Sequence, residues 1–335
     1  MIYRMAFEKY IITGKKSNDE PISFTVRGNE YVLQLSEKDL KEIVLSVLAN
    51  VKKLMHLELN KNSLTEIDLS PLTDLTNLNA LILSNNQLAA IDLTNLQNCN
   101  KLTLLHLTNN NIRELDLSPL QNFPNLETLS IGGNPLTKID LSPLTACTKL
   151  QNLYLDNCQI ESIDLTPLSG LTNLQTLHLS GNRLTKVDLS PLSSLTKLQY
   201  FFLSGNQLTE VDLSPLASWT NLERLELNKN SLKKLDLSPL AHCKNLRMLI
   251  LENNQLSELD LSPLKENKKI TTVTLTNNKL KQIDVTPMLN WPEFLLLKVD
   301  EKVVPLITSV DFPKKKKLPK GLQNYYKKLK HITKA

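Results

Sequence analysis

The apolar positions of this chain repeat with a period of 24 residues through most of its length. One copy runs from Leu174 to Lys197 and reads LQTLHLSGNRLTKVDLSPLSSLTK. A fixed period of about 20 to 50 residues predicts a solenoid, in which each repeat buries its apolar side against its neighbours. The leading apolar position occurs ten times, at Leu54, Leu78, Leu102, Leu126, Leu150, Leu174, Leu198, Leu222, Leu246 and Ile270.

Each copy contains two short stretches in which apolar and polar residues alternate. Leu177-His178-Leu179 predicts a strand with His178 pointing outward, and stacked copies of it predict a parallel sheet with strands about 4.8 Å apart. Val187-Asp188-Leu189 predicts a second short strand on the opposite side of the repeat. Ser190-Pro191 then predicts a helical turn, because a capping hydroxyl precedes a proline at the first helical position.

Two polar columns accompany this apolar pattern. Asn182 recurs in nearly every copy, and we expect its amide to turn inward and bond backbone groups of neighbouring turns. Cys158 takes this place in one copy. Asp188 belongs to a column of ten aspartates, which suggests either calcium binding or a side chain that accepts the backbone N–H two residues on. One carboxylate per turn offers too few oxygens for calcium, so we favour the structural role.

The copy contains L-x-x-L-x-L-x-x-N-x-L, and from Leu54 to about Glu293 the chain therefore resembles the leucine-rich repeat family. The phrase DLSPL-x-x-L-T-N-L is also similar to bacterial internalin-type arrays, although those use a shorter repeat. The resemblance implies an α/β solenoid. Its form would be a leucine-rich repeat horseshoe with a parallel concave β-sheet and with short strands or helical turns on the convex side.

The repeats divide the chain into four segments. Residues 1–53 are an N-terminal segment and cap, residues 54–293 hold the ten repeats, residues 294–312 are a degenerate last repeat and C-cap, and residues 313–335 are a basic tail. A cap is expected at each end because a solenoid otherwise leaves its core open to water.

The N-terminal cap has its own local signals. Residues 22–35 predict a hairpin around Arg27-Gly28-Asn29-Glu30. A capping box at Ser36 and Asp39 predicts that a helix follows, with one apolar face through Leu48. Residues 1–21 are expected to fray, and a separate functional module is the alternative to a cap.

Composition shows an uneven distribution of charge along the chain and bears on the cellular compartment. Lys and Arg number 19 against 24 acidic residues over residues 54–293, but 11 against 3 over residues 294–335. No apolar run approaches the roughly 20 residues of a membrane span, and no secretory signal is expected. The four cysteines fall on repeat positions, so no disulfide framework is needed, and we expect a cytoplasmic protein.

Departures from the repeat identify the candidate binding surface. Tyr154, His178 and Phe202 occupy the outward middle column on neighbouring strands, and outward aromatic residues often mark contact sites. The alternative is that these side chains only pack against one another across a curved sheet. The full set of candidate partner-binding residues is Leu104, His106, Tyr154, His178, Tyr200, Phe202, Arg224, Glu226, Met248 and Ile250.

The lysine-rich tail is a second candidate. Residues 313–335 carry nine lysines and no acidic residue, and residues 322–332 predict a short basic helix. Such a segment suits an anionic partner, either nucleic acid or an acidic membrane surface, and the alternative is a tail that only aids solubility. The lysines concerned are Lys314, Lys315, Lys316, Lys317, Lys327, Lys328 and Lys330.

Catalytic chemistry has little support in the sequence. His106 and His178 lie three strands apart, roughly 14 Å, so they cannot share a metal. Neither a Cys/His metal motif, a glycine-rich phosphate loop nor a nucleophile elbow is present. We therefore predict no cofactor, metal or small-molecule substrate. The sequence favours a non-catalytic scaffold or adaptor for a protein partner on the concave face, with an anionic-surface binder as the alternative.

Overall fold

The computed structural model describes residues 8–308 and 313–331. These residues divide into two compact units, Met1–Ile160 and Glu161–Ala335, and each unit is described by itself. Within the described residues, no helix is both long enough and apolar enough to cross a membrane.

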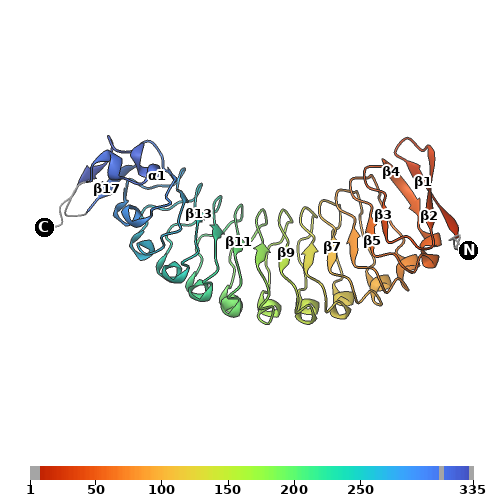
Figure 1. The fold of residues 1–335 in the computed structure, drawn as a ribbon. Coiled ribbons are helices and arrows are strands. Elements are labelled where there is room, and N and C mark those ends of the chain that lie inside the picture. The colour runs from red at the N-terminus through yellow and green to blue at the C-terminus, as the bar shows by residue number, and fades with distance from the viewer. Residues whose placement is uncertain (1–7, 309–312, 332–335) are drawn as a thin grey trace, which may run out of the picture. The chain divides into compact units, whose positions relative to one another are not determined.

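Each unit carries a sheet of short parallel strands, one from each repeat (Figure 1). Neighbouring strands are offset by one repeat, so that His56 lies beside Ala80 and Tyr200 beside Arg224. The predicted parallel sheet is therefore confirmed in both units. Unit 1 contributes β3 (Val32–Gln34), β5 (His56–Glu58), β6 (Ala80–Ile82), β7 (Leu104–His106), β8 (Thr128–Ser130) and β9 (Asn152–Tyr154). Unit 2 contributes β10 (Thr176–His178), β11 (Tyr200–Phe202), β12 (Arg224–Glu226), β13 (Met248–Ile250), β14 (Thr272–Thr274) and β16 (Leu296–Lys298).

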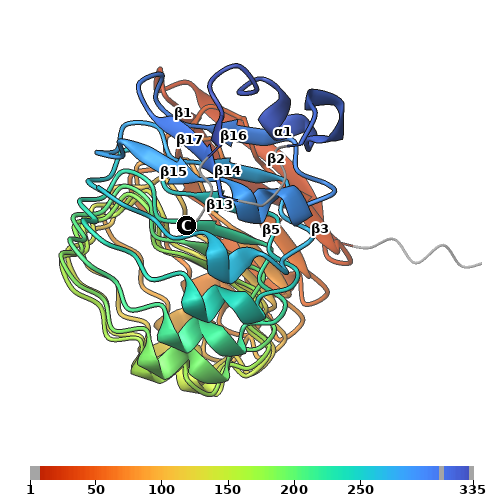
Figure 2. The ribbon, with the colours of Figure 1, turned by 90° about the vertical axis from the view of Figure 1, so that its left-hand side faces the viewer.

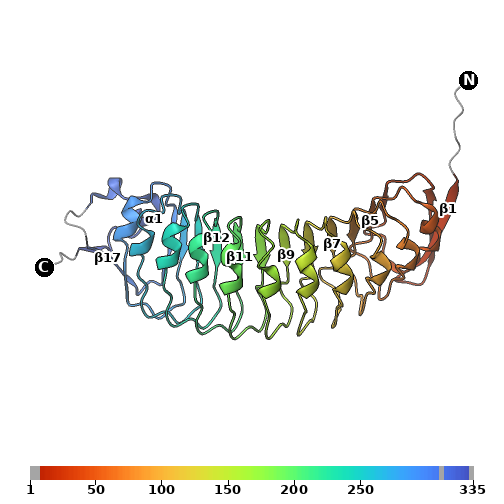
Figure 3. The same cartoon turned by 90° about the horizontal axis from the view of Figure 1, so that it is seen from below.

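A one-turn helix follows each of the ten strands β5 to β14 and lies opposite it, as Figure 3 shows from below. The predicted helical turns are confirmed, and all ten are 3₁₀-helices that begin at Ser or Thr, nearly always with proline next. They are η2 (Ser70–Leu72), η3 (Thr94–Leu96), η4 (Ser118–Asn122), η5 (Ser142–Ala146), η6 (Thr166–Leu168), η7 (Ser190–Ser194), η8 (Ser214–Ser218), η9 (Ser238–His242), η10 (Ser262–Leu264) and η11 (Thr286–Asn290).

The predicted second strand at Val187–Leu189 is wrong. In the part of unit 2 that the structure describes, this position forms a strand only in the last repeat, as β15 (Gln282–Asp284). A strand needs a bonded neighbour, and β15 finds one in the parallel strand β17 (Val304–Ile307). In earlier repeats the backbone bonds between neighbouring turns lie before this position, for example Gln207 N–H to Leu184 O at 2.9 Å. The residues aligned with Val187–Leu189 in the described repeats then form no ladder of backbone bonds with the next repeat.

The predicted inward role of the asparagine column is confirmed. The amide of Asn206 donates to Leu179 O in the preceding repeat and to Leu203 O in its own, both at 3.0 Å. Its side-chain oxygen accepts the N–H of Leu184 at 3.1 Å. One buried side chain thus satisfies three backbone groups and joins two turns of the solenoid.

A left-handed residue precedes the asparagine in every repeat, and sequence reasoning did not detect it. Its φ lies between 52° and 70° in all ten copies. Glycine or asparagine, which tolerate this conformation best, fill eight of the ten places, and lysine fills two. The residues are Lys61, Asn85, Asn109, Gly133, Asn157, Gly181, Gly205, Lys229, Asn253 and Asn277.

The aspartate column has the structural role that we favoured. Asp188 Oδ1 accepts the backbone N–H of Ser190 at 2.9 Å, and the same bond recurs at Asp68 and Asp236. These bonds, first the backbone N–H of Ser190 and then its hydroxyl, hold the pKa of Asp188 below its ordinary value. Each aspartate therefore fixes the start of the 3₁₀-helix that follows it.

Cysteine or tryptophan takes the place of Leu195 in five repeats, at Cys99, Cys147, Trp219, Cys243 and Trp291, and these buried side chains also donate hydrogen bonds. Trp219 Nε1 donates to Leu192 O at 2.9 Å, and Cys243 Sγ donates to Leu216 O at 3.3 Å. Each bond reaches a carbonyl of the preceding repeat. The four cysteines are free, and burial raises the pKa of the Cys147 thiol to about 12. They are inert core residues.

The N-terminal cap differs from the prediction. The hairpin consists of β1 (Lys9–Lys16) and β2 (Pro21–Arg27), so its turn lies at residues 17–20 and not around Gly28. The segment after Gly28 turns instead into β3, which pairs with β5 in the repeat sheet. Residues 9–16 were expected to fray, but they are the central strand of a three-stranded sheet ordered β2-β1-β4.

The helix predicted after Ser36 is also wrong. Residues Leu40–Val44 form β4, which pairs with β1, and only Ser46–Asn50 is helical, as the 3₁₀-helix η1. Glu37 and Asp39 have φ values of 59° and 58°, which no right-handed helix contains. The capping-box pattern therefore lies on a turn.

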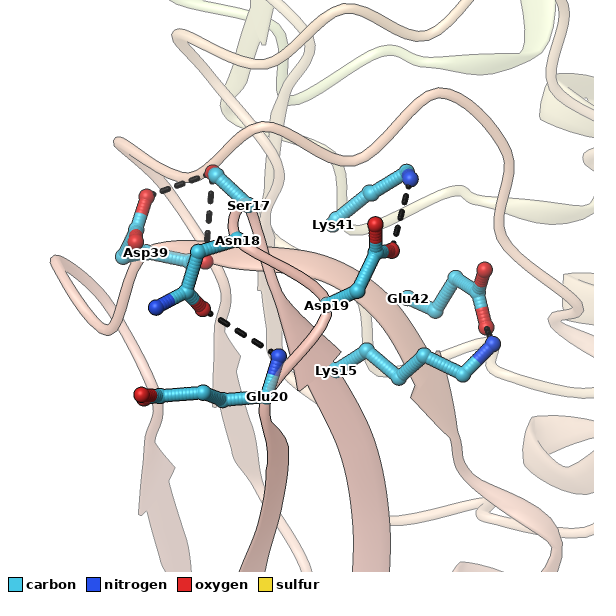
Figure 4. A network of polar contacts seen from close by, with 8 residues as sticks. All are labelled: Lys15, Ser17, Asn18, Asp19, Glu20, Asp39, Lys41 and Glu42. Atoms are coloured by element: carbon cyan, nitrogen blue, oxygen red, sulfur yellow. Dashed lines mark hydrogen bonds and ion pairs between the residues drawn. The ribbon is translucent and has the colours of Figure 1, made fainter.

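A polar network fastens the hairpin turn to Asp39 and to the beginning of β4 (Figure 4). Ser17 Oγ donates to Asp39 Oδ1 at 2.5 Å, and Lys41 Nζ pairs with Asp19 Oδ1 at 2.8 Å. These pairs are exposed, so they fix geometry more than they add stability.

The basic C-terminal segment is folded onto the end of the repeats, which corrects its description as a tail (Figure 2). Leu318, Leu322 and Leu329 are buried, because they cover the apolar residues of the last repeat. The predicted helix over residues 322–332 is replaced by α1 (Lys320–Gln323) and the two-residue strand β18 (Lys330–His331), while residue 332 lies outside the described residues. Within this segment, η12 (Lys315–Lys317) is one further 3₁₀ turn.

This segment also covers the open edge of β16. Tyr325 OH donates to Leu297 O at 3.0 Å, and Gly321 N–H donates to Phe294 O at 3.1 Å. A Cβ on Gly321 would lie 2.7 Å from the Phe294 ring, so only glycine permits this approach. The last strand is therefore capped by main-chain and side-chain donors from the lysine-rich segment.

We predict that Asn206→Ala lowers the free energy of unfolding by about 1–3 kcal/mol, because it leaves the buried N–H of Leu184 without a partner and removes one of the two amide bonds at Leu179 O and at Leu203 O. Asn221→Ala is the matched control, since its exposed amide makes one bond, to Thr196 O at 2.9 Å. Urea unfolding of both variants provides the measurement. Equal losses from the two variants would contradict the role given to the column.

Candidate functional site

The first and third residues of each short strand share one face of the sheet. The middle residue, such as Phe201 or Leu225, is fully buried, while the residues on either side of it are mostly half-buried. This confirms the predicted inward and outward positions. The outward side chains of unit 2 include all the candidates from His178 to Ile250.

Phe202 is the centre of an aromatic group on β10 and β11. The ring of His178 meets it edge-on at 4.8 Å between centroids, and the ring of Tyr200 stacks at 6.5 Å with an interplanar angle of 9°. Both distances suit favourable aromatic pairs. The rings enclose one another, so each is half-buried before any partner binds.

Arg224 on β12 completes this group. Its guanidinium carbon lies 5.7 Å from the centroid of the Phe202 ring, within the range of a cation–π contact. Its Nε also donates to Glu226 Oε1 at 2.5 Å, while the other Glu226 oxygen accepts a bond from Ser204 Oγ at 3.3 Å. We call His178, Tyr200, Phe202, Arg224 and Glu226 the Phe202 cluster.

The remaining candidates of unit 2 extend this cluster. Met248 lies beside Arg224 and Ile250 beside Glu226 on the next strand, and both are half-buried. The structure therefore brings seven of the ten predicted residues together on four adjacent strands. The apolar side chains of β13 border the charged pair on one side, and the aromatic rings border it on the other.

The other three candidates belong to unit 1. Leu104 and His106 share β7, and Tyr154 lies on β9, where it neighbours Ser130 of β8. All three are half-buried on the outward face. Burial lowers the pKa of His106 below its ordinary value, so this imidazole is neutral at pH 7.

Sequence reasoning missed three exposed apolar side chains that share one column of the repeat. Tyr31 and Met55 of unit 1 are 51% and 40% exposed, and Leu295 of unit 2 is 58% exposed. Each directly precedes a strand, a position that is polar in most copies, as at Gln175. A comparison of that column between the end repeats and the central repeats would have revealed them.

No group suited to a metal ion is present among residues 8–308 and 313–331, where no three His, Cys, Asp or Glu side chains gather. A hollow of about 790 Å³ on the opposite side of unit 2 is lined in part by Asp236, Asp260 and Asp284. Each of these carboxylates already accepts a backbone N–H two residues on. The carboxylates that line this hollow therefore serve the local backbone structure.

Comparison with known families agrees with this architecture. A model described as a leucine rich repeat matches residues 76–136, 148–208 and 203–256, and a model of two such repeats matches residues 124–171. The protein belongs to the leucine-rich repeat family. Domains of this family generally mediate protein–protein interactions and are typically non-catalytic. A comparison with curated protein sequences gives no match.

Several solved structures share the fold. An internalin from Listeria monocytogenes is 30% identical, with a TM-score of 0.71, over 84% of this chain and 78% of that one. A leucine-rich repeat protein of Leptospira interrogans is 20% identical, with a TM-score of 0.63, over 82% and 71%. The ectodomain of a plant membrane receptor kinase from Arabidopsis thaliana is 22% identical, with a TM-score of 0.62, over 78% and 34%. The last two likenesses show the fold alone.

The depressed pKa of His106 predicts a pH dependence of stability. The unfolded chain binds a proton at this histidine more tightly than the folded chain, so stability falls as the pH drops below about 6.5. We expect urea unfolding of the native protein to lose more stability between pH 8 and pH 5.5 than His106→Gln loses. Equal losses in the two proteins would show that His106 titrates alike in both states.

Proposed function

We propose that this protein is a non-catalytic scaffold or adaptor that binds a protein partner through the Phe202 cluster. The observation that carries the proposal is the arrangement around Phe202, where two aromatic rings and an arginine hold one phenylalanine on the outward face of the sheet. Family membership supports a binding role in general.

The cluster is suited to an interface because its side chains are already ordered. Aromatic and arginine side chains dominate the binding energy of many interfaces, and groups fixed before binding lose little entropy. Arg224 is held by Glu226, yet its side chain is 40% exposed and retains donors for a partner. Glu226 is only 17% exposed, so we assign it a positioning role.

The test compares Phe202→Ala and Arg224→Ala with Tyr31→Ala, which removes an exposed aromatic residue of unit 1. The partner is isolated with the intact protein, identified by cross-linking to β10–β13, and then measured by calorimetry. We expect a loss of affinity of roughly tenfold to a hundredfold for the two cluster variants and no loss for the control. Unchanged affinity of a folded Phe202→Ala protein would exclude the proposal, and a large drop in Tm would show that Phe202 is core.

The lysine-rich segment supports a second candidate function, the binding of an anionic surface. Lys314 to Lys317, Lys320, Lys327, Lys328 and Lys330 are all exposed, while the leucines between them are buried. Among the described residues, these lysines make one contact with a carboxylate, a loose one from Lys328 Nζ to Glu301 Oε1 at 3.8 Å. The charges are therefore displayed on a folded cap, which favours a defined anionic partner over a purely solubilising tail.

Salt dependence tests this second function. Duplex DNA and vesicles with anionic lipid serve as the two probes, and we expect affinity for one of them to fall steeply between about 50 and 200 mM salt. Replacing Lys314 to Lys317 with glutamine should remove most of the binding. Substitution is preferable to deletion, because deletion would also uncover Phe294 and Leu297. Binding that persists in the glutamine variant would rule out this segment.

A further inference from the structure

The outer strand of the N-terminal cap has an open edge. The three-stranded sheet of unit 1 is ordered β2-β1-β4, so among residues 8–308 and 313–331 the strand β2 (Pro21–Arg27) has a bonded neighbour on one side only. Its sequence, PISFTVR, contains the good strand formers Ile22, Phe24, Thr25 and Val26, and it has no lysine or acidic residue that would discourage pairing. At seven residues, β2 is longer than any strand of the repeat sheets.

The register shows which backbone groups face outward. Tyr10 pairs with Val26, Ile12 with Phe24 and Gly14 with Ile22, and the flanking bonds Gly28 N–H to Glu8 O and Lys16 N–H to Glu20 O are both 2.9 Å. Hydrogen-bonded pairs alternate along an antiparallel ladder, so the even-numbered residues of β2 bond to β1. The N–H and C=O groups of Ser23 and Thr25 therefore point away from the sheet, and none of the bonds found for the described residues uses them.

The two ends of this edge are complementary to each other. Pro21 has a carbonyl but no N–H to offer. Arg27 has an N–H, but its carbonyl already accepts the N–H of Glu30 at 3.0 Å. An antiparallel neighbour that is centred on Phe24 would place Arg27 opposite Pro21. The free N–H of Arg27 then meets the free carbonyl of Pro21. The Arg27 carbonyl, which is already occupied by Glu30, lies opposite the Pro21 nitrogen, which has no proton to donate.

We propose that β2 is a self-association edge, on which a second copy of this chain docks its own β2 antiparallel around a two-fold axis at Phe24. Ser23 of one copy lies opposite Thr25 of the other and exchanges two backbone bonds with it, and the symmetry repeats this pair. Arg27 N–H and Pro21 O add one bond at each end. The two three-stranded sheets become one continuous sheet, and such a self-complementary contact closes at two copies.

The side chains agree with this register. Phe24 and Ile22 are only half-buried in the single chain, whereas Val26, the next residue on the same face of β2, is buried. The two-fold axis brings Phe24 of the two copies to a non-hydrogen-bonded pair, in which Cβ atoms lie about 4.5–5.5 Å apart. Arg27 also comes beside the turn that carries Glu20 of the second copy, so opposite charges meet at both ends.

A register shifted by one residue pair fits less well. Centring the contact on Thr25 would place Ser23 opposite Arg27, and the Ser23 N–H would then compete with Glu30 for the Arg27 carbonyl. The register centred on Phe24 leaves no such conflict. The proposal therefore specifies both the occupant and the residue at the axis.

The first test measures self-association of the full chain by sedimentation equilibrium. We expect a dimer for the native protein and for Thr25→Ala, which keeps the backbone N–H. Thr25→Pro removes that N–H on the outward side only, so it should leave β1–β2 pairing intact and weaken the dimer by roughly thirtyfold or more. A native protein that stays monomeric, or a folded Thr25→Pro protein that dimerises unchanged, would overturn the proposal.

The second test identifies the register by disulfide cross-linking. Phe24→Cys should form a covalent dimer under mild oxidation, because the axis brings the two thiols together. Ile22→Cys is the matched control, since residue 22 lies opposite residue 26 of the second copy and not opposite itself. The native cysteines are buried and do not compete. Equal cross-linking of both variants, or cross-linking of Ile22→Cys alone, would exclude a contact centred on Phe24.

Discussion

The fold depends on a buried amide that satisfies backbone groups where the chain leaves each strand. At this bend the main chain cannot form a ladder, and an unpaired buried N–H or C=O costs about 1–3 kcal/mol. Asn134, which is 1% exposed, donates to Leu107 O and Ile131 O and accepts from Ile112 N–H. A single residue type thus joins each turn to the one before it, and the preceding left-handed residue provides the bend that aims the amide inward.

The repeat fold could be predicted because each of its recurring residues has a local physical reason. Leucine alternation indicated the strands, Ser-Pro indicated the turns, and the asparagine column indicated inward bonds. The prediction failed at Val187–Leu189, because alternation records which side of a residue is buried but not whether the backbone has a neighbour within bonding distance. The last repeat shows the difference, since Gln282–Asp284 becomes a strand only where β17 lies beside it.

The cap was predicted less well because its residues do not recur. Leu40, Ile43, Val44 and Leu48 have the spacing of a helix face, yet the first three lie in β4, which pairs with residues of β1 that precede them by 24 or more positions. No local pattern reveals such a partner. The candidate site was predicted in part. The repeat register placed Tyr200, Phe202 and Arg224 on one face, but it did not show that Arg224 would cover the Phe202 ring and donate a hydrogen bond to Glu226.

The two ends of the repeat array meet the same physical problem in different ways. Strand β16 is an edge, and the lysine-rich segment covers it with the Tyr325 hydroxyl and the Gly321 N–H. At the other end, β3 has β5 as its one bonded neighbour among the described residues, and the three-stranded sheet of the cap has a further edge at β2, where Ser23 and Thr25 present backbone donors and acceptors. Natural sheets usually protect such an edge with charge, proline or a covering segment. Here proline occupies only the first position of β2, and in the proposed pairing it lies opposite Arg27, whose carbonyl already accepts the N–H of Glu30, so Ser23 and Thr25 stay available to an identical edge.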